Sequence, residues 1–235
     1  MRINNFDFSI RQPHLEQAAE SLGPDGTGIA LFRAVAYRDI LSSAMKEIND
    51  PAKVQWRSQR HEFTNARGAL IKENYDAFAL RLHRGDREMA DRLPTILALT
   101  RAVELLATRD MAQYFPALND WRADEMTIHR YDAGKVGISS HRDPTRYNGI
   151  ISSLTLAGEG LLSVGDEDTG IQEIPLGPGD LFLMRGPGLY EAPSGVDIRP
   201  MHRVDGARTS LMNRDNLLPD KRFEGVVYDN WPTKS

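Results

Sequence analysis

The chain has 235 residues, of which 40% are hydrophobic, so it is long enough to bury one large core. Its 33 acidic residues outnumber 29 lysines and arginines, and no global positive field would attract nucleic acid. Cysteine is absent, which excludes disulfides and thiolate metal ligands, and no apolar run reaches the roughly 18 residues of a membrane span. We therefore expect one compact cytoplasmic unit without a membrane partner.

Helical periodicity dominates residues 1–120. Apolar side chains recur at three- and four-residue steps in three segments, which we predict as one-faced helices. These segments are residues 14–22, 37–48 and 95–108. Residues 28–32 are typical of a short strand, whereas residues 52–75 show no clear period, and we expect them to form loops around an entrance. We predict that residues 1–120 are a helix-rich support packed on the core.

From residue 121 onward the hydrophobic period changes to two, and turns rich in glycine, proline and aspartate become frequent. The pattern predicts eight short strands. They cover residues 126–131, 136–141, 150–157, 160–164, 171–174, 180–184, 198–204 and 207–212. So many short strands in one stretch are typical of a double-sheet jelly roll or a barrel. The sequence therefore predicts an α+β fold with its sheet in residues 121–235.

Two histidines and an aspartate form a candidate metal site. His141 and Asp143 stand two positions apart where a predicted strand ends, so both can point to one side. His202 lies on a later predicted strand. Two imidazoles and one carboxylate can hold a divalent iron and leave its other positions open, as in non-haem oxygenases. The remaining histidines that lack a partner at ligand spacing are interpreted as structural or surface residues. They are His14, His61 and His83.

An arginine follows the second histidine. If residues 204–206 form a three-residue loop, His202 and Arg208 lie opposite each other on one face, whereas a two-residue loop separates them. We predict the three-residue loop, because a guanidinium there can hold a carboxylate bidentately. Arg214 shares a side with Arg208 on a continuous strand, and two inward arginines require an anionic guest. The alternative is that Arg214 lies past the strand end and pairs with Asp215 or another surface acid.

These motifs resemble those of the iron(II)- and 2-oxoglutarate-dependent oxygenases, and among them the AlkB-like branch. The resemblance is carried by residues 128–135, 141–143, 178–183, 202–204 and 208–214. It implies a double-stranded β-helix (jelly roll) as the catalytic region, residues 121–235, braced by the N-terminal helices. It also implies that His141, Asp143 and His202 bind Fe(II) and carry the catalysis.

The same resemblance implies a binding site for 2-oxoglutarate, the cosubstrate. Arg208 would hold its distal carboxylate with help from Ser210 and the Tyr131 hydroxyl, and Arg214 would lie near the other carboxylate. His129 takes the place of a family asparagine, so one hydrogen bond to the cosubstrate is either supplied by imidazole or lost. The alternative for Tyr131 is a core aromatic residue with its hydroxyl at the surface.

The residues after the ligand pair bear on the substrate. Where repair enzymes of the AlkB-like branch have acidic residues that read a base edge, this chain has Arg146. An arginine repels a protonated methylated base but can clamp a carboxylate or phosphate. Arg142 and Arg146 are therefore the candidate substrate contacts. We predict a dioxygenase that uses Fe(II), 2-oxoglutarate and O2 to hydroxylate, desaturate or cyclise a small, anionic metabolite such as an amino acid or a specialised-pathway intermediate.

Two other classes stay open. An AlkB-like nucleic-acid demethylase would need a basic, aromatic-lined groove from the N-terminal half. Its candidate residues are Arg57, Arg60, His61 and Arg67 beside Trp56. A non-enzymatic metal-binding jelly roll of the cupin type would place His-x-His and a glutamate around its metal, and the sequence has no such histidine pair. The acidic balance disfavours nucleic acid, so a small molecule is the predicted partner.

Overall fold

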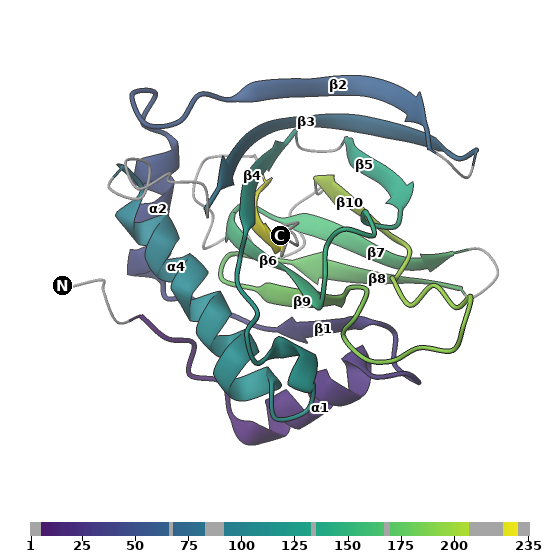
Figure 1. Cartoon of the computed structure of the whole chain (residues 1–235). Coiled ribbons are helices and arrows are strands. Elements are labelled where there is room, and N and C mark those ends of the chain that lie inside the picture. Colours follow the sequence, from purple (N-terminus) through teal and green to yellow (C-terminus); the bar gives the residue numbers. More distant parts are fainter. Residues whose placement is uncertain are drawn as a thin grey trace.

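The structure, a computed structural model, describes residues 6–65, 68–82, 92–132, 135–166, 170–206 and, for the backbone alone, 223–229. Its strands form one antiparallel, 11-stranded sheet that folds into two facing layers (Figure 1). One layer has the order β1-β9-β6-β11-β4-β3, and the other has the order β5-β10-β7-β8. Strand β2 pairs with β3 at the outer side. The predicted jelly roll is confirmed.

The strands have the following bounds. They are β1 (Ile29–Phe32), β2 (Arg57–Thr64), β3 (Leu70–Arg81), β4 (Glu125–Tyr131), β5 (Val136–His141), β6 (Ile150–Ala157), β7 (Gly160–Asp166), β8 (Gly170–Leu176), β9 (Leu181–Arg185), β10 (His202–Gly206) and β11 (Phe223–Asp229). Strands β1, β2 and β3 precede residue 120 and join the same sheet as the later strands. The N-terminal part therefore supplies sheet as well as helices.

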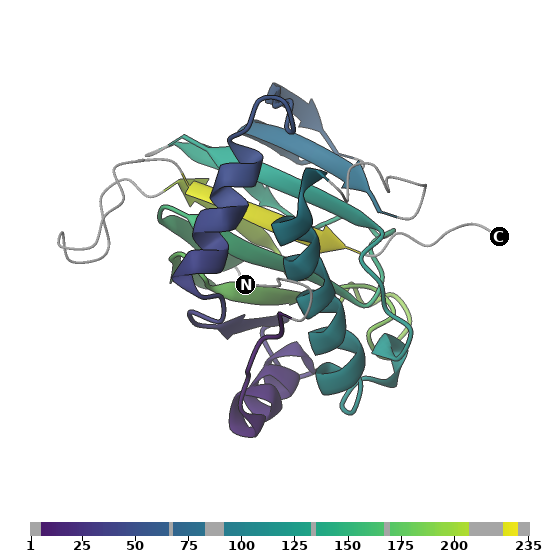
Figure 2. The ribbon, with the colours of Figure 1, turned by 90° about the vertical axis from the view of Figure 1, so that its left-hand side faces the viewer.

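The helices cover the outer face of the first layer (Figure 2). They are α1 (Gln12–Leu22), α2 (Arg38–Ile48) and α4 (Pro94–Leu105), which continues as a π-helical turn, η2 (Leu106–Met111), followed by the short 3-10 helix η3 (Pro116–Leu118). All three predicted helices are confirmed, and their apolar sides are buried in the larger core cluster. Among the described residues, no helix is both long and apolar enough to cross a membrane.

A buried carboxylate joins α2 to the start of α4. Glu47 accepts hydrogen bonds from the backbone N–H groups of Thr95 (2.8 Å) and Ile96 (3.2 Å). These groups lie in the first turn of α4, where backbone donors have no partner within the helix. Glu47 therefore caps a helix from a distant part of the chain and fixes α4 against the outer face of the sheet.

The period-two alternation of the strands separates two environments. In β4, Met126 and Ile128 are fully buried in the core cluster under the helices, whereas Thr127, His129 and Tyr131 line a cavity between the layers. Strands β6 and β9 alternate in the same way. Their helix-facing residues are Ile150, Leu154, Leu156, Leu181 and Leu183, and their cavity-facing residues are Ile151, Ser153, Phe182 and Met184. Side-chain parity on the strands thus decides which residues reach the site.

Two predictions about backbone structure are wrong. In place of the loops predicted for residues 52–75, the chain forms β2 and the first half of β3, which pair along the whole length of β2. In place of the tight loop predicted for residues 204–206, these residues belong to β10 and pair with β7 as far as Gly206 opposite Gly160. A long-range partner strand overrides the local turn preference of Asp205-Gly206 there.

The end of the sheet also differs from expectation. The predicted strand over residues 207–212 lies outside the described residues. The strand between β4 and β6 is β11, which the sequence pattern does not predict. Its register places Gly225 opposite His129, and a glycine in the middle of a strand weakens the alternation from which strands are predicted.

Candidate metal centre and cosubstrate pocket

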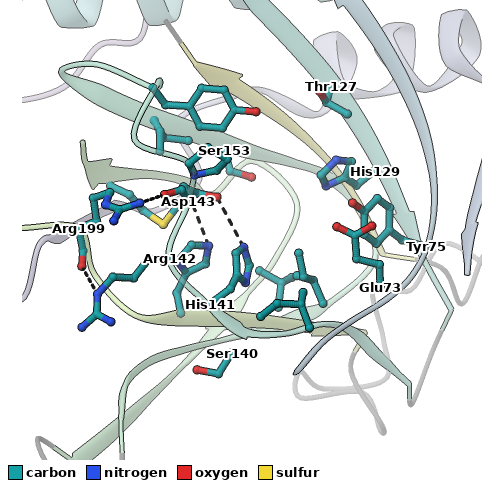
Figure 3. A pocket seen from close by; sticks show the side chains of 18 of the residues that line it. Glu73, Tyr75, Thr127, His129, Ser140, His141, Arg142, Asp143, Ser153 and Arg199 are labelled. Carbon is teal, nitrogen blue, oxygen red and sulfur yellow. Dashed lines mark hydrogen bonds and ion pairs between the residues drawn. The ribbon is translucent and has the colours of Figure 1, made fainter. Parts of the chain in front are cut away.

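Three side chains from two strands and a following loop converge at one wall of the cavity (Figure 3). His141 is the last residue of β5 and His202 the first of β10, and the two are directly paired across the sheet. Asp143 follows β5. Its carboxylate lies 3.5 Å from His141 Nε2 and 3.7 Å from His202 Nε2. The three side chains offer ligand atoms within 4.8 Å of one another, so the predicted convergence is confirmed.

Backbone carbonyls orient both imidazoles. Nδ1 of His141 lies 2.8 Å from the carbonyl oxygen of Ser139, and Nδ1 of His202 lies 3.3 Å from that of Pro200. A carbonyl oxygen can only accept a hydrogen bond, so each Nδ1 carries a hydrogen and each Nε2 is the ring nitrogen that faces Asp143 and can bind a metal. Metal-binding histidines commonly have this arrangement. The donor set of two imidazole nitrogens and one carboxylate therefore fits Fe(II).

Burial and charge set the protonation states of these groups. Burial lowers the pKa of His202 to about 4, so this imidazole is neutral near pH 7. Burial alone would raise the pKa of Asp143, but His202 and His141 outweigh it and the net shift is downward. Burial likewise opposes the charged form of His141, but the hydrogen bond and charge of Asp143 outweigh it and raise its pKa. Asp143 is thus ionised, as a metal ligand must be.

The three side chains open onto a cavity of about 880 Å³ between the two layers of the sheet. Strands β3 and β4 form its opposite wall, and β2, Pro144 to Tyr147 and Met201 contribute to its lining. Sites for small molecules commonly have volumes of about 300–1,000 Å³. The cavity is therefore large enough for a cosubstrate and a small substrate together.

A cluster of neutral polar rings lies on the β3–β4 wall. Nδ1 of His129 is 3.0 Å from the Tyr131 hydroxyl, and the ring of Tyr75 lies 4.5 Å from that of His129. Burial lowers the pKa of His129 to about 4 and raises the pKa of both tyrosines. Near neutral pH the cluster therefore holds an uncharged imidazole and two protonated hydroxyls, and the hydroxyl of Tyr131 is a donor suited to a carboxylate.

Two residues of this wall are missed by sequence reasoning. Tyr75 and Glu73 lie on β3, and Glu73 accepts a hydrogen bond from Tyr75 and lies 2.8 Å from His61 Nε2. The inward positions of β3 alternate, but they mix apolar and polar types. They are Ile71, Glu73, Tyr75, Ala77 and Ala79. Side chains of such a strand point alternately inward and outward, but apolar and polar residues do not alternate with them. The sequence therefore shows no hydrophobic period of two.

Three arginines lie at the cavity on the side of Asp143. Arg142 and Arg146, the predicted substrate contacts, both line the cavity. Arg142 Nε donates to the carbonyl oxygen of Arg199 at 3.0 Å. Arg146 donates to the Tyr147 hydroxyl at 2.9 Å and stacks over its ring. Arg199, which the sequence pattern does not single out, also lines the cavity.

The predicted cosubstrate residues Arg208, Ser210 and Arg214 lie outside the described residues.

In the part that the structure describes, acids pair with two of the candidate basic residues of a nucleic-acid groove, Arg60 and His61. Arg60 lies 3.2 Å from Asp76, and His61 pairs with Glu73. Trp56 is covered by the guanidinium of Arg130, 4.0 Å from the ring centroid. Arg67 lies outside the described residues. Neighbouring acids thus compensate Arg60 and His61 on β2, whereas Arg57 is exposed.

Solved structures with a similar fold include a prolyl hydroxylase and α-ketoglutarate-dependent enzymes. A solved prolyl hydroxylase from Trichoplax adhaerens, in complex with a hypoxia-inducible-factor peptide, is 12% identical and matches with a TM-score of 0.57 over 95% of each chain. A full-length protein of Neurospora crassa, solved in complex with α-ketoglutarate, is 12% identical and has a TM-score of 0.57, with 94% of this chain and 81% of that chain covered.

A third match is the α-ketoglutarate-dependent epimerase SnoN of nogalamycin biosynthesis. It is 14% identical and has a TM-score of 0.53, with 94% of this chain and 84% of that chain covered. At such identities these matches establish the fold alone. None of the curated proteins matches the chain significantly.

The family is established by sequence as well. A model of the 2OG-Fe(II) oxygenase superfamily matches residues 31–197, more than half of the chain. This range includes β2 to β9, the first histidine and the aspartate of the candidate metal centre. The chain belongs to the 2OG-Fe(II) oxygenase superfamily, whose enzymes depend on Fe(II) and 2-oxoglutarate.

Proposed function

We propose that this enzyme is a dioxygenase that oxidises a C–H bond of a small, anionic metabolite, such as an amino acid or a specialised-pathway intermediate. The observation that carries the proposal is the convergence of His141, Asp143 and His202 at the wall of an 880 Å³ cavity. The cavity leaves room beside these ligands for both 2-oxoglutarate and a substrate.

We assign the two histidines and Asp143 as the Fe(II) ligands. Both imidazoles present Nε2 toward the carboxylate, and the carbonyls of Ser139 and Pro200 hold their orientation. When bound, Fe(II) together with 2-oxoglutarate and O2 supplies a C–H oxidation coupled to the decarboxylation of 2-oxoglutarate to succinate. The protein side chains position the reactants and exclude water from the closed end of the cavity.

We assign the polar ring cluster to the cosubstrate. The Tyr131 hydroxyl can donate a hydrogen bond to a carboxylate of 2-oxoglutarate while it accepts one from Nδ1 of His129, because burial keeps the hydroxyl protonated and the imidazole uncharged near neutral pH. Arg208 completes this site with its charge, supported by Ser210 and with Arg214 near the other carboxylate. The cluster alone carries no positive charge, so it orients the cosubstrate while Arg208 supplies most of the attraction.

The charges of the cavity favour an amino acid as the substrate. Arg142 and Arg146 lie on the Asp143 side and can hold a carboxylate. Glu73 lies across the ligand side chains from Arg142 (Figure 3), and 16% of its side chain remains exposed. A carboxylate at that place favours a substrate ammonium group. A molecule with both charges is therefore the best fit, and hydroxylation is the expected outcome.

Other outcomes of the same C–H oxidation are desaturation and ring closure. Solved proteins of this fold include the epimerase SnoN and the carbocyclase SnoK, both of nogalamycin biosynthesis. The distance of the substrate carbon from the metal, and the groups around it, decide between these outcomes. We propose hydroxylation because it is the default outcome of such a C–H oxidation.

The alternative is an AlkB-like nucleic-acid demethylase. The order of the motifs from Tyr131 to Arg214 supports that branch. The compensated charges on β2 speak against a groove that tracks a phosphate backbone, since affinity for nucleic acid depends on free lysines and arginines.

One assay separates these functions. Protein purified without oxygen is incubated with Fe(II), ascorbate and 2-oxoglutarate against a panel of amino acids and of methylated oligonucleotides, and succinate release is measured after air is admitted. We expect release to increase with an amino acid. Release that increases with a methylated oligonucleotide instead would overturn the small-molecule proposal, and a protein that never consumes 2-oxoglutarate would overturn the assigned site.

A further inference from the structure

Two arginines join the two chain segments that carry the metal ligands. Arg142, which stands between His141 and Asp143, donates from Nε to the carbonyl oxygen of Arg199 at 3.0 Å. Arg199, which precedes His202 by three residues, donates from Nη1 to the carbonyl oxygen of Asp143. Each segment therefore gives a side-chain donor to the backbone of the other. We name this reciprocal pair of contacts the arginine clasp.

An aspartate fixes the guanidinium of Arg199 within the clasp. Asp197 accepts from Nε of Arg199 at 2.8 Å and from Nη2 at 2.7 Å, a bidentate pair. The side chain of Arg199 is only 10% exposed, so solvent weakens this pair little. All three guanidinium nitrogens thus have a partner. Nε and Nη2 bind Asp197, and Nη1 donates to the carbonyl oxygen of Asp143 (Figure 3).

The three ligands differ in how their backbones are held. His141 and His202 are paired with each other in the sheet, so the strand ladder fixes both. Asp143 lies beyond the end of β5 and is followed by Pro144, which has no N–H to donate. The backbone of Asp143 therefore depends on contacts from outside the ladder, and Arg199 supplies one of them.

We propose that Arg199, held by Asp197, is a positioning residue that places the Asp143 carboxylate for metal binding, and that Arg142 closes the clasp from the other side. The inference rests on the proposed assignment of Asp143 as an Fe(II) ligand. Groups that hydrogen-bond to a metal ligand and orient it are important for affinity. Their removal commonly weakens metal binding about 10- to 100-fold.

The test measures binding of Mn(II), used in place of the air-sensitive Fe(II), to metal-free protein by isothermal titration calorimetry. Arg199→Gln should weaken Mn(II) binding about 10- to 100-fold. Asp197→Asn keeps the shape of the carboxylate but removes its charge, and it should weaken binding in the same direction by a smaller factor.

A matched control separates positioning from general loss of stability. Arg33 donates to the carbonyl oxygen of Pro175 and to Asp180, both at 2.6 Å, so it makes the same kinds of bond as Arg199. None of these three residues lines the cavity of the metal centre. Arg33→Gln should lower the melting temperature yet bind Mn(II) within about twofold of the wild type, a change of about 0.4 kcal/mol at about 1.4 kcal/mol per tenfold.

Wild-type affinity in folded Arg199→Gln would overturn the clasp, as would an equal loss in Arg33→Gln. If Arg199→Gln does not fold, Asp197→Asn decides the matter, because wild-type affinity there is equally incompatible with the proposal. A failure of the proposed function looks different. The wild type would then bind no Mn(II), or Asp143→Ala would bind it as tightly as the wild type.

Discussion

The two faces of the same strands serve different purposes in this molecule. On the helix-covered face, β4 contributes Met126 and Ile128, which are fully buried among apolar neighbours. On the cavity face it contributes Thr127, His129 and Tyr131, which are polar yet largely enclosed. Burying a polar group costs free energy unless it has a hydrogen-bond partner. The outer face therefore stabilises the fold, and the inner face retains polar groups whose use is binding and catalysis.

The largest effect is expected from the cavity face. Asp143→Ala should abolish succinate release, because it removes the one anionic ligand of the proposed metal site. The melting temperature of the metal-free protein should change little, since the carboxylate faces His141 and His202 at the cavity wall and does not pack in the apolar core. Activity is measured by succinate and stability by circular dichroism. Full activity in this variant would show that the metal assignment is wrong.

The comparison is sharpest between two neighbouring residues of β4. Ile128→Ala should lower the free energy of unfolding by about 2–5 kcal/mol, because it leaves a void in the core under the helices. His129→Ala should instead raise the apparent KM for 2-oxoglutarate and leave stability nearly unchanged. Chemical denaturation and cosubstrate titration of both variants check this. Equal loss of stability in both would contradict the separation of the two faces.

The β4 alternation shows what could be predicted from the sequence. A strand with apolar residues at every second position and His129 and Tyr131 between them has its register and its two faces specified by the period alone. Strand β5 is less regular, because Ile138, Ser140 and His141 all line the cavity and its pairing with β10 has register shifts. The convergence of His141, Asp143 and His202 was predictable because the ligand types and spacings of such sites are restrictive.

Other parts were not predictable, because distant partners determine them. Strand β3 has Glu73 among its inward residues, so the polarity of a residue no longer indicates which face of the strand it lies on. Asp205-Gly206 is typical of a turn, but pairing with β7 holds it in a strand. Arg199 falls within the strand predicted for residues 198–204, but in the structure the strand begins only at His202, and the role of Asp197 and Arg199 depends on a contact with Asp143 that is distant in sequence.

The pH dependence of stability provides a smaller effect on the cavity face. Burial lowers the pKa of His129 to about 4, below its ordinary value of 6.5. The unfolded chain therefore binds a proton between these values that the folded chain does not, and stability falls as the pH drops from about 6.5 toward 4. In His129→Asn the unfolded chain no longer takes up a proton at this position. The metal-free variant should therefore lose less stability than the wild type between about pH 7 and pH 5. Denaturation series at the two pH values check this, and an equal loss in both proteins would contradict the burial of a neutral imidazole on this face.

The smallest effect is expected from a single hydroxyl. Tyr131→Phe keeps the ring in the core between the layers but removes the donor that lies 3.0 Å from His129. A neutral hydrogen bond contributes about 0.5–1.5 kcal/mol, so the apparent KM for 2-oxoglutarate should rise about two- to tenfold with little change in kcat. Arg208→Ala should raise it further, because a charged donor binds a carboxylate more strongly than a hydroxyl does. If Tyr131→Phe left the KM unchanged while Arg208→Ala raised it, Tyr131 would be a core aromatic residue of the inner face, and the charge of Arg208 would hold the cosubstrate without the ring cluster.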